Sequence, residues 1–193
     1  MTRKVPVSFT IPLYLAAFLL AASIFFPWWG MTFVAPQYPE GLEIIVYPYK
    51  MDGRIDIING LNHYIGMKPF SEASFPELRY LPYLIGGMAA LVLLAAIIRG
   101  KGWLYGIIAL FAAGGIAGLY DIHRWLYNFG TELSPTAPIK IKPFVPPILG
   151  RNQIANFVTH SYFSYGSIMI GVAFLLMALS LVLMERHARR RPS

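Results

Sequence analysis

Four long runs of apolar residues dominate the pattern of hydrophobic and polar positions in this chain. The runs extend from about residue 7 to 28, 75 to 98, 103 to 120 and 164 to 184. A transmembrane helix needs about 20 apolar residues, and each run is close to that length, with no charged residue in its central part. We therefore expect an all-α membrane protein in which residues 1–193 form one domain of four transmembrane helices.

The first run has a second interpretation, because Arg3 and Lys4 place a basic segment directly before it. A basic start followed by an apolar stretch is also the pattern of a secretory signal peptide. We expect this run to be retained as the first span. Two long loops, residues 29–74 and 121–163, then lie between the first and second helices and between the third and fourth.

Local patterns within the two loops predict a structured outer cap. Residues 42–49 are rich in β-branched and aromatic side chains and predict a short strand. Residues 56–67 place apolar side chains at helical spacing, which predicts an amphipathic helix at the membrane interface. The third helix is expected to continue to Gly130, and residues 152–161 are expected to extend the fourth helix outward. The proline-rich residues 135–147 predict an extended segment.

The distribution of charge predicts an orientation for the four helices. The chain carries a formal net charge of +7 at pH 7. Basic residues are densest in the N-terminal segment, the turn at Arg99 and Lys101, and the C-terminal tail, where Glu185 is the one acid. Short loops rich in Lys and Arg face the cytoplasm. We expect a multi-pass protein of the inner membrane, with both termini cytoplasmic and both long loops extracytoplasmic.

The basic tail that follows the fourth run fits anionic lipid headgroups better than nucleic acid, since it is short and adjoins a span. The expected partners are therefore the lipid bilayer and larger membrane or extracytoplasmic protein subunits. Small residues on the third run, Gly114 and Gly118, form a face that permits close helix contact. We expect this face to pack inside the bundle, with contact to a partner subunit as the alternative.

Candidate chemistry is confined to histidine and methionine side chains in the outer segments. His63 and Met67 are four residues apart, so a helix would place them on one face. Imidazole nitrogen and thioether sulfur are ligands that suit copper, Cu(I) especially. His123 and His160 lie just outside the third and fourth spans, and we expect them to complete a copper site with His63. The candidate groups that hydrogen-bond to these ligands are Glu77, Asp121 and Tyr64.

A structural interpretation of the same residues stays open. A histidine at a membrane interface is commonly an amphipathic anchor, and a His/Met pair at this spacing arises often by chance. His63 is the strongest candidate, because a polar Asn-His-Tyr group interrupts an apolar segment there. His123 also suits the C-terminal end of a helix, where its charge meets the helix dipole.

Several classes of function are disfavoured by what the sequence lacks. It has no cysteine, which excludes disulfides, thiol catalysis and thiolate metal sites. It has no phosphate-binding loop, nucleophile elbow or zinc-protease motif, so we do not expect an enzyme. No histidine or charged residue lies in the middle of a span, which disfavours a buried haem and a proton or ion path.

Four segments together resemble a family of small four-span membrane proteins encoded near copper-dependent nitrous oxide reductase in some bacteria. They are residues 35–42 (APQYPEGL), 58–69 (INGLNHYIGMKP), 75–79 (FPELR) and 137–141 (APIKI). The resemblance covers most of the chain and is strongest in the outer loops. It implies an accessory role in maturing, or delivering electrons to, an extracytoplasmic copper enzyme, and it implies no ligand set.

The sequence therefore predicts an accessory or assembly subunit for an extracytoplasmic metalloenzyme, handling copper or delivering electrons at the outer face. Two alternatives stay open. The chain is either a structural small subunit of a respiratory or transport complex without its own metal, or a quinol-interacting electron-transfer subunit. The last would need a groove lined by aromatic residues with a hydrogen-bonding histidine or Glu77.

Overall fold

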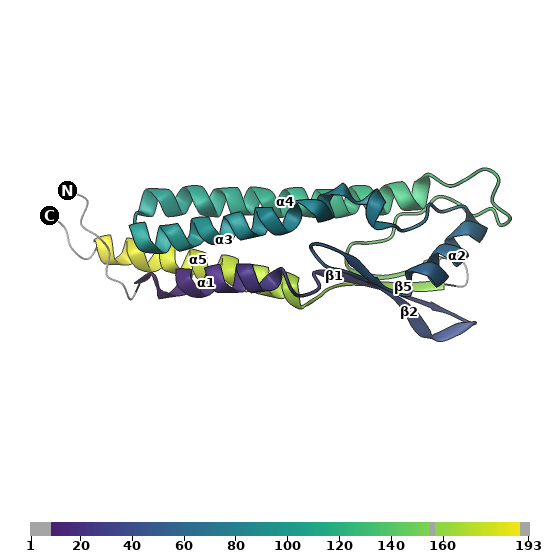
Figure 1. Cartoon of the computed structure of the whole chain (residues 1–193), viewed down its shortest axis with the longest axis horizontal. Coiled ribbons are helices and arrows are strands. Elements are labelled where there is room, and N and C mark those ends of the chain that lie inside the picture. The colour runs from purple at the N-terminus through teal and green to yellow at the C-terminus, as the bar shows by residue number, and fades with distance from the viewer. Residues whose placement is uncertain (1–8, 155–156, 190–193) are drawn as a thin grey trace.

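The chain folds into a helical bundle that carries a β-sheet cap at one end (Figure 1). The computed structural model describes residues 9–154 and 157–189. The bundle contains α1 (Ile11–Ser23), α3 (Leu81–Ile98), α4 (Lys101–Thr131) and α5 (Tyr165–Arg189). The outer part of α4 runs past the bundle and alongside the cap.

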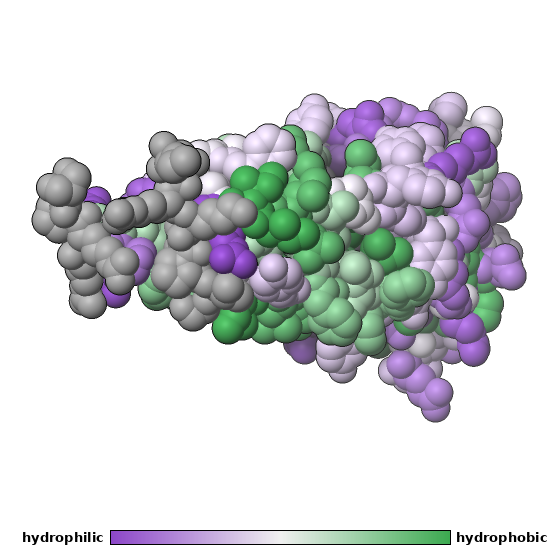
Figure 2. All heavy atoms as spheres, turned by 60° about the vertical axis from the view of Figure 1, so that its left-hand side comes forward, coloured by the Kyte–Doolittle hydropathy of each residue, from purple (hydrophilic) through white to green (hydrophobic). Residues whose placement is uncertain are grey.

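Three of the described helices, α3, α4 and α5, are long and apolar enough to cross a membrane. The fourth bundle helix, α1, has 13 residues and is about 20 Å long at 1.5 Å per residue, which is shorter than the roughly 30 Å of a bilayer core. The surface of the bundle is hydrophobic between more polar ends (Figure 2). Leu13, Leu20, Val92 and Met177 are among the fully buried side chains that fill its core.

The helix boundaries differ from the expected spans at two places on the cap side. The first run was expected to span residues 7–28, but α1 ends at Ser23 and a strand begins at Trp29. The second was expected from residue 75, but two 3₁₀ turns precede α3, which begins at Leu81. The predicted outward extension of the third helix is confirmed, since α4 continues to Thr131.

The expectation of an all-α protein is wrong, because the two outer loops together build a five-stranded antiparallel sheet. Its strands are β1 (Trp29–Ala35), β2 (Tyr38–Val46), β3 (Met51–Gly53), β4 (Gly150–Ile154) and β5 (Phe157–Phe163). They are ordered β3-β2-β1-β5-β4. The first loop supplies β1 to β3, and the second supplies β4 and β5.

Residues 152–154 and 157–161 are therefore strand and not an extension of the fourth helix, and residues 155–156 lie outside the described part of the chain. Their apolar spacing is compatible with a helix, but the backbone hydrogen-bonds to β1, and Thr32 lies opposite His160 in the ladder. The strand predicted at residues 42–49 is confirmed in part, because β2 covers its first half and begins earlier, at Tyr38.

Successive side chains along each strand point to opposite faces of the sheet, and one of these faces is covered by helices. Met31 and Phe33 of β1 point to this face together with Leu42 and Ile44 of β2, which lie opposite them in the ladder. The helix α2 (Ile55–Ile65) and the outer end of α4 cover it. The helix predicted at residues 56–67 is thus confirmed, although it ends two residues earlier, and its apolar side packs in the cap. Its place at the membrane interface stays a prediction.

A tight joint connects the bundle to the cap. The carbonyl of Trp28 accepts hydrogen bonds from the Ser164 amide at 2.9 Å and the Ser167 hydroxyl at 2.6 Å. The Gly166 amide donates to the Pro27 carbonyl at 2.8 Å. The cap-side ends of α1 and α5 are therefore held together where the segments that connect them to β1 and β5 meet. The α3–α4 turn and the Arg189 end of α5 lie at the opposite end (Figure 1).

The glycine face of the third span does not pack as expected. A Cβ atom built at Gly114 or Gly118 meets nothing within 4 Å among the described residues. Close internal contact would place a neighbouring helix against these glycines. The expectation that this face packs inside the bundle is therefore wrong.

Candidate functional site

The predicted copper ligands do not come together. His63 lies on α2, His123 on α4 and His160 on β5, and all three side chains are exposed. Across residues 9–154 and 157–189, no group of three or more His, Cys, Asp or Glu side chains is arranged to hold a metal ion. The expectation that these three segments converge on one outer pocket is not met.

His63 and Met67 do not share a helix face, because α2 ends between them. Gly66 adopts the left-handed conformation, with φ of 77°, and closes the helix after Ile65. The Met67 amide then donates to the Asn62 carbonyl at 2.9 Å. The Met67 side chain is buried below α2, whereas the imidazole of His63 is exposed beside Tyr64, at 6.3 Å between ring centroids.

His160 lies on the uncovered face of the sheet. Its ring stacks against that of Tyr162 at 6.0 Å between centroids. Its neighbours in sequence, Thr159 and Ser161, alternate to the covered face and are buried. Because α2 packs on the covered face, the sheet itself separates His160 from His63.

The donor set therefore does not fit one copper ion. A Cu(I) site needs soft ligands that point at a common centre, and here one thioether is buried while the three imidazoles are exposed on three different elements. We assign no copper chemistry to His63, Met67, His123 and His160 acting together.

Glu77 and Asp121, which were predicted to hydrogen-bond to histidine ligands, are joined instead by an arginine. Arg124 pairs with Asp121 at 2.7 Å and with Glu77 at 3.2 Å. The indole of Trp125 also donates to Glu77, at 3.1 Å. The other carboxylate oxygen of Glu77 is buried and has no hydrogen-bond partner among the described residues. This cluster links the turn before α3 to α4 just beyond the apolar stretch 103–120.

Burial raises the pKa of the Asp121 carboxyl above its ordinary value, and the negative charge of Glu77 raises it further. The Arg124 guanidinium opposes both effects without cancelling them. The cluster is therefore an interhelical joint whose two acids repel each other at neutral pH.

The uncovered face of the sheet carries a row of polar side chains across four strands. Glu43, Thr32, His160 and Arg151 lie opposite one another in the ladders of β2, β1, β5 and β4. Directly opposed residues share a face. Val34 and Val158 lie beside this row and are 38% and 40% exposed. We call this surface the open sheet face.

One end of the open sheet face is fixed by the half-buried phenol of Tyr162. The Tyr162 hydroxyl donates to the Glu43 carboxylate across β1. The Tyr162 ring lies directly over Gly30, where a Cβ atom would come within 2.6 Å of it. Burial, and then the hydrogen bond to Glu43, raises the pKa of Tyr162 from 10.0 to about 12.

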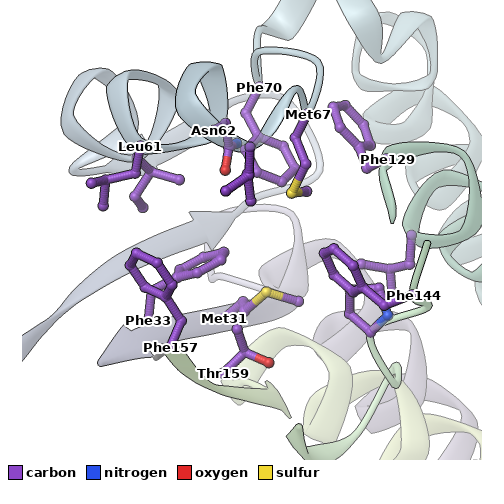
Figure 3. Close-up of a pocket in the computed structure, with 14 residues that line it drawn as sticks. Met31, Phe33, Leu61, Asn62, Met67, Phe70, Phe129, Phe144, Phe157 and Thr159 are labelled. Atoms are coloured by element: carbon purple, nitrogen blue, oxygen red, sulfur yellow. The ribbon is translucent and has the colours of Figure 1, made fainter. Parts of the chain in front are cut away.

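The covered side of the sheet contains a pocket of about 40 Å³ between the strands, α2 and the end of α4 (Figure 3). We call it the cap pocket. Met31 from β1 and Met67 from the turn after α2 both point into it. Five aromatic side chains supply a large part of the remaining wall: Phe33, Phe70, Phe129, Phe144 and Phe157.

Asn62 is the polar residue that sequence reasoning missed. It is 4% exposed, points from α2 into the cap pocket, and its side-chain nitrogen has no hydrogen-bond partner within the described part of the chain. The available signal was its spacing, since Asn62 follows the buried Ile58 by four residues. The metal site was predicted at the neighbouring His63 because imidazole is a better metal ligand than an amide.

Comparison of the sequence with models of protein families finds no matching family. Comparison with curated proteins finds no relative either.

Proposed function

We propose that this protein is a non-enzymatic accessory subunit that holds its cap against a larger extracytoplasmic protein through the open sheet face. The observation that carries the proposal is a sheet mounted rigidly on an apolar bundle, with one face covered by α2 and α4 and the other left bare among the described residues. The tight joint at Trp28 and Gly166 fixes the direction in which the bare face points.

The composition of the open sheet face favours a folded protein as its partner. Glu43, Arg151 and His160 offer charges and hydrogen bonds, while Val34 and Val158 add apolar contact beside them. Protein interfaces also combine polar and apolar groups, and their overall composition is close to that of the general surface. A bilayer would instead favour a continuous apolar face.

The resemblance noted in the sequence indicates the class of partner, an extracytoplasmic metalloenzyme that uses copper. In this proposal the metal belongs to the partner, because the histidines of this chain do not form a site together. The chain anchors, orients or helps to mature that enzyme at the outer face of the inner membrane. The charge asymmetry supports this orientation, with both termini cytoplasmic.

Site-specific photo-crosslinking in native membranes tests the proposal. A photoreactive phenylalanine analogue at Val34 or Val158 is expected to form one adduct with an extracytoplasmic protein. The same analogue at Tyr64, which is exposed on the other side of the cap, is the matched control and is expected to give none. Equal adducts from all three positions, or none from Val34 and Val158, would contradict docking through this face.

Elemental analysis of the isolated complex separates the alternatives. Copper that stays with the partner after the two proteins are dissociated supports the accessory role. A stable complex without metal supports a structural small subunit. Copper that remains bound to this chain alone, and is lost on His63→Ala, would show that His63 binds the metal and would contradict the accessory role proposed here.

A further inference from the structure

We propose that the cap pocket is a dry site for one small uncharged gas molecule of two or three heavy atoms, held by dispersion contacts with its walls. The pocket lies on the covered side of the sheet, between the strands, α2 and the end of α4 (Figure 3). The open sheet face is on the other side, so this inference stands or falls independently of the proposed function.

The first observation is that the walls offer little to water or to a charged ligand. Apart from Asn62 and Thr159, every described residue that lines the cap pocket is apolar. The Thr159 hydroxyl donates to the Asn152 carbonyl at 3.3 Å, so its proton is engaged. Asn62 turns its amide oxygen toward the pocket, and its nitrogen is buried (Figure 3). Buried water typically makes about three hydrogen bonds, and a charge would lose its hydration here. An apolar guest is therefore favoured.

The second observation is the size of the pocket. Its volume of about 40 Å³ is roughly three times the 10–15 Å³ that one water molecule needs on the same scale. It is far below the roughly 150 Å³ of a cavity that holds benzene. The pocket therefore admits a molecule of two or three heavy atoms and excludes a six-membered ring.

The third observation is that the walls are held in place, so the pocket does not close by collapse. Asn59 donates to the Phe70 carbonyl at 2.8 Å and accepts from the Phe70 amide at 2.7 Å. The Phe70 ring stacks on Phe129, with 4.5 Å between centroids. On the far wall, the Phe144 amide donates to the Gly130 carbonyl at 3.0 Å. Walls that stay apart lose dispersion contacts, and a guest of matching size restores them.

The fourth observation is the polarisable character of the lining. Met31 from β1 and Met67 from the turn after α2 both point into the pocket (Figure 3). Thioether sulfur is polarisable, and the methionine side chain adapts its shape to a neighbour. Dispersion attraction between such groups and a polarisable gas molecule holds the guest without any hydrogen bond. The two methionine methyl groups also provide reporters inside the site.

Xenon is the test probe, because it is uncharged, polarisable and close in size to the proposed guest. The full-length protein, isotope-labelled at its methionine methyl groups, is placed in lipid nanodiscs under rising xenon pressure and followed by NMR. We expect the Met31 and Met67 methyl signals to shift together and to saturate. Met177, which is fully buried in the bundle core, is the internal control and is expected to show no saturating shift.

Leu61→Phe places a larger side chain on the pocket wall and is expected to abolish the saturating shift of Met31 and Met67. The matched control is Leu93→Phe on α3, which makes the same change at a residue 42% exposed and outside the pocket. It is expected to leave the shift unchanged.

Two further readings come from the unaltered protein and do not depend on a variant that folds. Benzene is expected to give no saturating shift, and magnetisation transfer from water to the Met31 and Met67 methyl groups is expected to be absent. No saturating shift under xenon, a shift that survives in Leu61→Phe, saturable binding of benzene, or transfer from water to these two methyl groups would each overturn the proposal.

Discussion

Trp28 lies against Gly166 so closely that a Cβ atom on residue 166 would come within 2.3 Å of the indole Cδ1. The indole nitrogen of Trp28 donates to the Ser23 carbonyl at 2.9 Å, which holds the ring in place at the end of α1. The contact joins the segment that follows α1 to the first turn of α5. It sets the angle between bundle and cap on which the proposed docking depends.

Gly166→Ala is expected to destabilise the protein by about 1–3 kcal/mol, because an extra methyl group in a packed contact forces neighbours to move. The thermal midpoint in detergent measures the effect. Gly171→Ala is the control on the same helix, since its Cβ would meet nothing within 4 Å. Equal midpoints for the two variants would show that the Trp28 contact relaxes without cost.

Gly130→Ala is expected to detach the proline-rich segment from the end of α4. A Cβ there would lie 1.9 Å from the Phe144 carbonyl oxygen, and the Phe144 amide donates to the Gly130 carbonyl at 3.0 Å. Because Phe144 lines the cap pocket, hydrogen exchange at its amide should accelerate and the pocket should open.

Gly114→Ala provides the comparison for that variant. It lies on the same helix, and its new methyl group meets no described atom within 4 Å. Alanine is favoured over glycine in a helix by about 1 kcal/mol, so this variant is expected to be neutral or slightly more stable. Faster exchange at Phe144 in Gly114→Ala would show that the Gly130 effect is not local.

Tyr162 is expected to ionise about two pH units later than an ordinary tyrosine, near pH 12. Its folded pKa is raised above the unfolded value, so its stabilising contribution is complete below pH 10 and is lost as pH rises through about 12. The difference in phenolate absorbance between the unaltered protein and Tyr162→Phe isolates this group. A midpoint near 10 would show that neither burial of the ring nor the Glu43 hydrogen bond raises the pKa of Tyr162.

Asp121→Asn is expected to stabilise the protein at pH 7 and to have less effect near pH 3.5. The Asp121 pKa is raised from its ordinary 3.8 by burial and by Glu77, so the folded state favours the protonated acid. That preference contributes stability at low pH and is lost as pH rises through the folded pKa. Thermal midpoints measured across this range test it, with Asp56→Asn on α2 as a control carboxylate that lies outside the cluster.

The local pattern of apolar residues was sufficient to predict the helices in which that pattern repeats over a long stretch. The extension of α4 to Thr131 and the existence of α2 follow from helical spacing and from stop signals in the neighbouring sequence. These features depend on contacts within one segment, and a period of 3.6 residues records such contacts directly.

Some boundaries could not be found in this way because neighbouring patterns merge. The apolar run of α1 passes without a charged residue through Trp28 into β1, so one long span was expected where a short helix and a strand exist. At the end of α2, the left-handed turn at Gly66 separates His63 from Met67. A glycine in the sequence permits that turn but does not require it.

The amino-acid sequence by itself determined that this is an apolar helical chain with two polar outer segments, since hydrophobic periodicity and charge density are local properties. Tertiary structure alone decided that those segments form a sheet, because Thr32 pairs with His160 far along the chain. The same pairing placed His160 and His63 on opposite sides of the sheet and turned Asn62 inward. Backbone hydrogen bonds between distant strands fix which face each side chain takes, and no local period carries that information.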